Sequence, residues 1–278
     1  MAHLFDSGYN RRPFSTLVAD YPGSDVYPPK DFRVEWGPIF HRGRLDGSAR
    51  VVVIGQDPGA HESIARRILV GEAGQRVQGF LAKLGIDISY VMVNTFVYSV
   101  YGQGGGQRHK DDPVIAEYRN RWLDALVAGS QVEAVVALGG LADSAFQAWK
   151  KTPTGQGVDV AYRHIPHPTY PESASAAGQK TKAEAMKEML ADWNDALTEL
   201  KPRIAHPDVE RDLVPYGESL DKATDLSSIP ERDLPAGVPE WMRSLDAWAV
   251  RRGEDAEAKR ATVVVTVPRK QRPWGPGG

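Results

Sequence analysis

The chain has 278 residues, and its 41% hydrophobic and 25% charged residues are typical of a globular protein with a sizeable core. It contains no cysteine, which excludes disulfides, a thiol nucleophile, and zinc or iron–sulfur sites with thiolate ligands. A net charge of −2 argues against a nucleic-acid binder held by bulk positive charge alone, but a local basic groove is compatible with it. Because no apolar leader follows Met1 and no apolar run approaches the roughly 18 residues of a membrane span, we expect a cytoplasmic protein without membrane contact.

The first 49 residues show no sustained period, which predicts a loop-rich lead-in with one short helix. Residues 51–54 are a continuous apolar run closed by Gly55, as is typical of a strand buried on both faces of a parallel sheet. Apolar residues at helical spacing then predict a helix that ends just before Gly85. Residues 90–97 are a second apolar run and predict a second buried strand.

The middle of the chain continues this alternation of strands and helices. Asp111 or Asp112 supplies a cap, and Pro113 a first-turn proline, for a helix that ends near Gly129. The elements predicted after it are a strand at 132–138, a short helix at 140–150, a strand at 158–165 and a helix at 180–200. The alternation predicts an α/β fold with a parallel sheet and right-handed crossovers.

Residues 201–278 form a C-terminal extension for which the sequence indicates no function. Its segments are acidic and contain proline, with an amphipathic helix predicted around Trp241, Leu245 and Trp248, a strand at 262–267, and a disordered end. The extension either enlarges the core or provides an oligomer contact. If the two tryptophans are exposed, they favour a homodimer.

Polar residues follow three of the predicted strands, at the carboxyl edge where a parallel sheet places its active site. Gln56 and Asp57 follow the first strand, Asn94 lies late in the second, and His167 follows the fourth. Taken singly, Asp-Pro-Gly suits a turn, and an isolated histidine is more often structural than catalytic. Asn94 must have its hydrogen bonds satisfied inside an apolar strand, so its amide either braces a loop or binds a ligand.

Together these motifs resemble the uracil-DNA glycosylase superfamily over residues 50–200. GQDP after the first strand, VNT late in the second and HP after the fourth are similar to the active-site motifs of its uracil-excising family. LVGEAG at 69–74, VVALG at 135–139 and HPTY at 167–170 are similar to motifs of its thermophilic iron–sulfur family, whose four cysteines are absent here. The resemblance implies a three-layer α/β/α fold with a central four-stranded parallel sheet.

The resemblance also implies roles for these residues. Asp57 would stabilise the sugar cation and position the attacking water. His167 would donate to the negative charge that develops on uracil O2, for which a neutral imidazole suffices. Asn94 would accept from uracil N3–H and donate to O4, a pattern that cytosine reverses. Gln56 would add a backbone contact to the base, and no metal or other cofactor would take part.

Three positions depart from the family pattern. Gly59 stands where the uracil-excising family has the tyrosine that excludes thymine, so the pocket should be roomier beside C5. Leu69 replaces the base-stacking phenylalanine, which should weaken stacking. We therefore expect tolerance of 5-substituted uracils or other deaminated bases. Tyr170 lies in the loop whose leucine wedges into the duplex, so either Tyr170 replaces that wedge or the altered loop favours single strands.

The segment 104–110, after the second strand, is predicted to be a flexible basic loop that contacts phosphate, with Arg108 as its arginine. A second interpretation rests on superfamily members that cross-link to uracil-DNA and carry a histidine in a similar arginine-rich loop. In that case His109 would trap the sugar cation in place of water. Further candidates for phosphate contacts are Arg66, Arg67, Arg76, Lys180 and Lys182.

The favoured hypothesis is a hydrolytic DNA glycosylase without metal or cofactor, which removes uracil from single- or double-stranded DNA and starts base-excision repair. The alternative is a uracil-DNA binding protein that cross-links through His109 with little turnover. An unrelated α/β enzyme that binds a nucleotide or a sugar phosphate is disfavoured, because no glycine-rich phosphate loop of the usual pattern follows the first strand.

Overall fold

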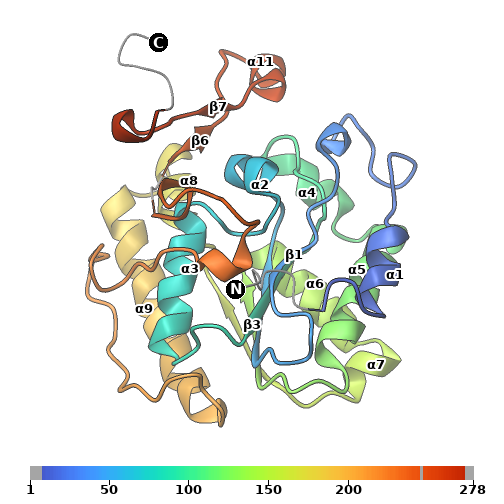
Figure 1. The fold of residues 1–278 in the computed structure, drawn as a ribbon, viewed down its shortest axis with the longest axis vertical. Coiled ribbons are helices and arrows are strands. Elements are labelled where there is room, and N and C mark those ends of the chain that lie inside the picture. The colour runs from blue at the N-terminus through green and yellow to red at the C-terminus, as the bar shows by residue number, and fades with distance from the viewer. Residues whose placement is uncertain (1–7, 245–246, 273–278) are drawn as a thin grey trace.

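The computed structural model describes residues 8–244 and 247–272, and its centre is a five-stranded sheet (Figure 1). The strands are β1 His41–Gly43, β2 Val51–Gly55, β3 Tyr90–Asn94, β4 Ala134–Leu138 and β5 Ala161–Ile165. Their order is β1-β3-β2-β4-β5, and all neighbours are parallel except β1, which runs antiparallel to β3. The predicted parallel sheet of four strands is confirmed, although β3, β4 and β5 are shorter than predicted.

Helices cover both faces of this sheet and confirm the three-layer arrangement (Figure 1). The larger helices are α3 Glu72–Lys83 and α9 Lys182–Leu200 on one face, and α5 Pro113–Val127 and α6 Gly140–Lys150 on the other. Successive side chains of a strand point to opposite faces, so β2 serves both layers. Val51 and Val53 join the core under α3 and α9, whereas Val52 and Ile54 join the core under α5 and α6.

Capping residues set the starts of two predicted helices. Asp112 starts α5, because its carboxylate accepts from the N–H groups of Val114 at 3.0 Å and Ile115 at 3.2 Å. Thr181 starts α9, and Glu184 completes a capping box by accepting from the Thr181 N–H at 2.9 Å. Both helices therefore begin within two residues of the predicted positions.

Short elements connect the layers. They are the helices α1 Phe14–Ala19, α2 Ala60–Ala65, α4 Gln103–His109, α7 Pro153–Gln156, α8 Tyr170–Ala176, α10 Trp241–Ser244 and α11 Ala256–Ala261, the 3₁₀ turns η1 Val34–Trp36, η2 Lys201–Arg203, η3 Glu231–Asp233 and η4 Arg269–Gln271, and the antiparallel pair β6 Ala249–Val250 and β7 Val264–Val265. α1 confirms the short helix predicted in the lead-in. α4 corrects the prediction of a flexible loop at 104–110. In the described part of the chain, no helix has the length and apolar character that crossing a membrane requires.

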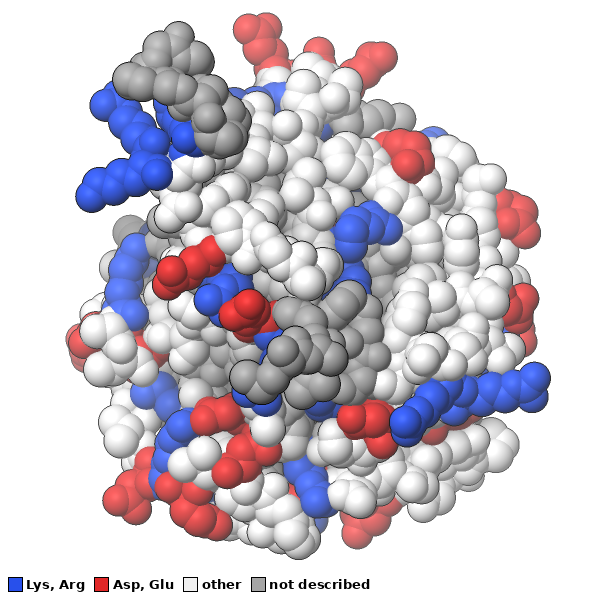
Figure 2. Space-filling model, viewed as in Figure 1, with Lys and Arg blue, Asp and Glu red and all other residues white. Residues whose placement is uncertain are grey.

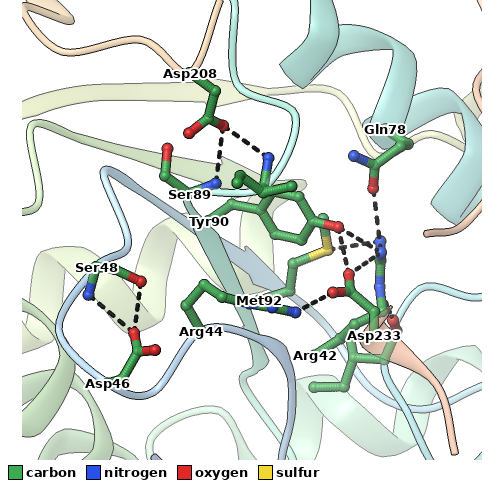
Figure 3. Close-up of polar contacts among 12 residues, drawn as sticks. Arg42, Arg44, Asp46, Ser48, Gln78, Ser89, Tyr90, Met92, Asp208 and Asp233 are labelled. Atoms are coloured by element: carbon green, nitrogen blue, oxygen red, sulfur yellow. Dashed lines mark hydrogen bonds and ion pairs between the residues drawn. The ribbon is translucent and has the colours of Figure 1, made fainter. Parts of the chain in front are cut away.

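β1 lies in the lead-in that was predicted to be loop-rich, and the sequence analysis missed it. Its residues His41, Arg42 and Gly43 form no apolar run, yet all three are buried. A buried ionic network explains the burial of Arg42 (Figure 3). The carboxylate of Asp233, on η3, pairs with Arg42 at 3.0 Å and also with Arg44. One carboxylate from the C-terminal extension thus compensates two guanidiniums of the lead-in.

The C-terminal extension also packs along the α3 side of the sheet. Asp208 Oδ2 accepts from the backbone N–H groups of Asp87, Ile88 and Ser89 at 2.7 to 2.9 Å (Figure 3). Tyr216 is buried in the core under α3 and α9. Of the two alternatives left open by the sequence, the described part of the extension therefore fits enlargement of the core.

The two tryptophans of the extension are not an exposed surface. Trp248 is 1% exposed, and its ring lies 5.8 Å from that of Trp241 and 4.8 Å from that of His61 on α2. Trp248 therefore does not meet the condition set for a homodimer, and the argument for one loses its basis. The predicted helix is reduced to α10, with Leu245 outside the described residues, and the predicted strand at 262–267 is reduced to β7. Of the end predicted to be disordered, residues up to 272 include η4, and the rest lies outside the described residues.

Candidate active site

The carboxyl edge of the sheet brings the predicted site residues to one side of the fold. Gly55, the last residue of β2, pairs with Asn94, the last residue of β3. Asp57 follows two residues after β2, and His167 follows two residues after β5. Only β4 separates β2 from β5, and adjacent strands lie about 4.8 Å apart, so these two strand ends stand roughly 10 Å apart.

Two glycines after β4 leave the space between these strand ends open. Gly139 has a φ of 82°, and a Cβ there would lie 3.3 Å from the Cβ of His167. Glycine therefore supplies a backbone conformation that other residues adopt with strain. Beside it Gly140 is exposed, and no heavy atom of the described residues, apart from its own neighbours and helix, lies within 4 Å of where its side chain would begin. The carboxyl end of β4 is therefore open at Gly140.

Two hydrogen bonds hold Asp57 in place. Its Oδ2 accepts from the backbone N–H of Val100 at 2.8 Å, and its Oδ1 accepts from Gln56 Nε2 at 3.1 Å. Burial raises the pKa of Asp57 to about 6, with a further rise from Glu62, against the two hydrogen bonds, which lower it. The carboxylate is therefore ionised at neutral pH but more basic than an exposed one.

His167 is held as a neutral imidazole. Its Nδ1 accepts from the backbone N–H of Thr169 at 3.2 Å and lies 2.8 Å from Thr169 Oγ1. Because a backbone N–H can only donate, this contact assigns the ring proton to Nε2. Burial, and second the charge of Arg76, lower the pKa of His167 to about 4. The result is an N–H donor that carries no net charge at neutral pH.

Arg76 of α3 braces the segment that carries His167. Its side chain is 3% exposed, donates to the Pro168 carbonyl, and pairs with Glu72 and, at 2.9 Å, with Glu172. The guanidinium is thus buried and paired within the protein. The prediction that Arg76 contacts phosphate is wrong.

Asn94 is buried at the end of β3 with an unused donor. Its side chain belongs to a residue that is 7% exposed, and Nδ2 has no hydrogen-bond partner among the described residues. A Cβ at Gly55 would lie 2.4 Å from Asn94 Oδ1, so only glycine at that position lets the amide lie against β2. A buried amide that braced a loop would have its donor satisfied. The unpaired Nδ2 therefore favours the alternative that Asn94 binds a ligand.

Glu62 of α2 connects the two loops in which the family pattern is altered. Its Oε2 accepts from the Gly59 N–H at 2.9 Å, and its Oε1 accepts from the Val70 N–H at 3.1 Å. Leu69, beside Val70, is 7% exposed, with a φ of 54°, and belongs to the core under α3 and α9. Sequence analysis missed Glu62, although a glutamate three residues after Gly59 has the spacing of a helix start.

The predicted DNA-binding residues of α4 are engaged with Asp31. Arg108 pairs with Asp31 Oδ1 at 2.5 Å, and His109 Nε2 lies 2.9 Å from Asp31 Oδ2. The side chain of Arg108 is 59% exposed, whereas that of His109 is only 15% exposed and packs 5.0 Å from the ring of Phe32. Arg108 can still reach a phosphate, but His109 has to leave Asp31 before its Nε2 can act as a nucleophile.

The remaining predicted contacts are spread over the surface. Tyr170 starts α8, and its hydroxyl lies 3.2 Å from Glu188 Oε2, while its ring packs partly against the core. Lys180 also pairs with Glu188, and Lys182 pairs with Glu172 at 2.9 Å. On the face drawn in Figure 2, Lys and Arg are interspersed with Asp and Glu. Contacts to a polyanion on that face must therefore come from individual side chains.

Comparison with known proteins places this geometry in a family. A search of curated proteins gave no match. A comparison with protein families matches residues 42–205, more than half of the 278, to the uracil DNA glycosylase superfamily. The matched span contains the four parallel strands together with Asp57, Asn94 and His167. On this match, and with an α/β fold that agrees with it, the chain belongs to the uracil DNA glycosylase superfamily.

Proposed function

We propose that this protein hydrolyses the N-glycosidic bond of uracil in DNA and thereby starts base-excision repair. Membership of the superfamily implies a DNA glycosylase that acts on uracil or another damaged base. The observation that supports uracil in particular is the buried amide of Asn94 with its unpaired Nδ2. It lies at the same sheet edge as an ionised Asp57 and a neutral His167.

The reaction begins when the target nucleotide leaves the strand and its base enters the gap beside β4. The bond from C1′ to uracil N1 breaks, and its electron pair goes to the base. Positive charge therefore grows on the sugar, where the Asp57 carboxylate stabilises it. Asp57 then takes a proton from the water that attacks C1′, and its pKa of about 6 suits a general base at neutral pH.

His167 stabilises the departing base. Negative charge develops on uracil O2, and the Nε2–H of His167 donates to it as an oxyanion-hole donor does. The contact between Nδ1 and the Thr169 N–H fixes which nitrogen donates and how the ring is oriented. A neutral ring also costs less free energy to bury than an imidazolium.

Asn94 selects the base. Its Oδ1 accepts from uracil N3–H, and its Nδ2 donates to uracil O4. Cytosine presents an acceptor at N3 and a donor at N4, so both contacts would be mismatched inside a buried site. A mismatch of that kind rejects an analogue by a factor of about 10⁴ to 10⁵.

The direct test is incubation of the protein, in EDTA and without added metal, with end-labelled single- and double-stranded oligonucleotides that each contain one uracil. We expect alkali-labile product in excess over the protein. The preference between the two substrates measures the effect of the altered segment at Tyr170. Absence of product from both substrates would contradict the proposed function.

The covalent alternative is tested by parallel samples that are run on SDS gels without alkali. A stoichiometric adduct that is lost in His109→Ala would support cross-linking through His109. The contact between His109 and Asp31 argues for hydrolysis, because the ring nitrogen is already engaged.

We expect kcat/KM for uracil excision to fall about tenfold per pH unit below pH 6 and to be constant above it. The active form of Asp57 is the ionised one, and it is lost as the pH falls through the pKa of about 6. His167, with a pKa of about 4, is already neutral in this range, so its titration does not change the pH dependence of the rate. Single-turnover rates between about pH 4.5 and 9 measure the profile. Because the hydrogen bond from Gln56 lowers the pKa of Asp57, Gln56→Ala should move the midpoint to higher pH. A profile that stays flat down to pH 5 would contradict the role of Asp57.

Replacing Gly59 by tyrosine is expected to narrow the substrate range. A ring at this position would fill the space beside C5, so excision of 5-substituted uracils should fall at least about tenfold relative to uracil. A Cβ at Gly59 would lie 2.8 Å from Glu62 Oε2, so the Glu62 side chain has to shift in any variant. Gly59→Ala is the matched control, because it adds the same Cβ without the ring. If both variants change the ratio of the two rates equally, Gly59 does not set the substrate range.

A further inference from the structure

A cationic side chain of the C-terminal extension reaches the surroundings of Asp57. Arg251 follows β6, and its Nη2 donates to Ser63 Oγ of α2 at 3.2 Å. Its guanidinium carbon lies 5.2 Å from the ring centre of Trp36 on η1. α2 begins three residues after Asp57. Arg251 therefore links α2 to η1, which belongs to the lead-in.

A second guanidinium borders the same loop. Phe32 forms a β-bridge with Val100, whose N–H donates to Asp57. Arg33 is the next residue, and its guanidinium carbon lies 4.0 Å from the ring centre of Tyr101. The guanidiniums of Arg251 and Arg33 therefore each pack on an aromatic ring and lie next to the segments that surround the Asp57 carboxylate.

Arg251 has no ion-pair partner among the described residues. Its Nη1 is buried without a hydrogen-bond partner, and no carboxylate of the described residues lies within ion-pair distance. Burial, and next the charge of Arg33, lower the pKa of Arg251 to about 10, while Tyr101, Glu35 and Asp57 act in the opposite direction. The group stays charged at neutral pH. Holding it there without an anion costs free energy, which a bound anion would recover.

We propose that Arg251, together with Arg33, binds a backbone phosphate of the DNA strand beside the extruded nucleotide. The inference rests on the proposed function and adds a contact to it. A sugar that reaches Asp57 brings its flanking phosphates over the loop that these two side chains border. A guanidinium matches a phosphate with parallel N–H donors, and the aromatic rings hold its plane. Since the family match ends at residue 205, this contact comes from outside the matched domain.

The test measures binding rather than excision. The probe is a single-stranded oligonucleotide with one 2′-fluoro-2′-deoxyuridine, whose glycosidic bond resists cleavage, and fluorescence anisotropy gives Kd over a series of salt concentrations. Arg251→Gln is expected to raise Kd about tenfold at low salt. It should also reduce the slope of log Kd against log salt by about 0.7, the value for one phosphate contact on a single strand. Arg251→Lys keeps the charge, and we expect it to keep the slope.

Arg252→Gln is the matched control, because it removes the same charge from the next residue, which is exposed. It should leave the slope unchanged. Equal changes of slope in Arg251→Gln and Arg252→Gln would overturn the inference, because net charge alone would then explain them. An unchanged Kd in Arg251→Gln would also overturn it. Thermal unfolding of each variant checks that the fold is retained. If Arg251→Gln unfolds, Arg251→Lys is compared by Kd, which should rise because an ammonium lacks the paired N–H donors of a guanidinium, and an unchanged Kd would overturn the inference.

A scan with uncharged methylphosphonates, one linkage at a time, locates the contact. In the wild-type protein one linkage near the uracil should account for the tenfold loss, and in Arg251→Gln the same substitution should have no further effect. The proposal would be overturned if no single methylphosphonate changed Kd and inorganic phosphate displaced the oligonucleotide from the wild-type protein but not from Arg251→Gln. The site would then bind free phosphate. Excision with an unchanged salt slope would overturn this inference and leave the proposed function intact. Binding that depends on Arg251 without any excision would support this inference and contradict the proposed function.

Discussion

Asp57→Asn is expected to lower kcat for uracil excision by about 10³-fold while DNA binding is retained. The amide has nearly the shape of the carboxylate, and its Oδ can still accept from the Val100 N–H. It carries no charge to stabilise the sugar cation, and it cannot take a proton from water. Single-turnover rates at saturating protein measure the chemical step, and anisotropy with an uncleavable substrate measures binding.

Asp159→Asn is the matched control for that variant. Asp159 is exposed and precedes β5, so it lies at the amino edge of the sheet, opposite the candidate site. The control should excise uracil at the wild-type rate. A rate for Asp57→Asn within tenfold of the wild type would remove Asp57 from the mechanism.

Asp233→Ala is expected to destabilise the fold by about 3 to 5 kcal/mol, because it leaves the guanidiniums of Arg42 and Arg44 buried without their carboxylate. The hydroxyl of Tyr90 loses its acceptor in the same step, although it still accepts from Arg42 Nη1. In a chain of this size the melting temperature should fall by about 10 °C. Urea unfolding followed by tryptophan fluorescence and circular dichroism gives the change in the free energy of unfolding.

The control for this variant is Asp20→Ala, which breaks an exposed pair with Arg121 at 3.2 Å. Exposed pairs contribute little, so the control should unfold close to the wild type. If Asp233→Ala unfolds with the same midpoint as Asp20→Ala, the network around Arg42 does not stabilise the fold.

The parallel sheet and the candidate site were predictable because their signals are local. Each parallel strand except β5 is an uninterrupted apolar run in the sequence, and Asp57, Asn94 and His167 stand at strand ends, which the topology of a parallel sheet brings to one edge. The contacts that tune these residues were not predictable. A backbone N–H, such as that of Val100, leaves no trace in a sequence. Nothing in the sequence indicates that the N–H of Thr169 donates to His167.

The errors have a different cause, since they come from partners that are distant in the chain. β1 has no apolar pattern, because its arginine is compensated by Asp233 rather than placed in solvent. The glycines of 104–106 suggested a loop, but that stretch lies within α4. Trp248 has the pattern of an exposed apolar face, and a sequence does not distinguish a partner on another chain from α2 of the same chain. In each case tertiary contacts overrode the local signal.

The distance in sequence between Arg42 and Asp233 also has a consequence for how the molecule is made. The two residues are 191 positions apart. At about 5 to 20 residues per second, a ribosome needs roughly 10 to 40 s to reach Asp233 after β1 has been synthesised. During that time Arg42 and Arg44 lack their carboxylate, so β1 covers the outer edge of β3 less stably, and an exposed strand edge is a site where chains associate wrongly. The buried arginines of the lead-in therefore gain their carboxylate only when the extension arrives, which makes this pairing a late step of assembly.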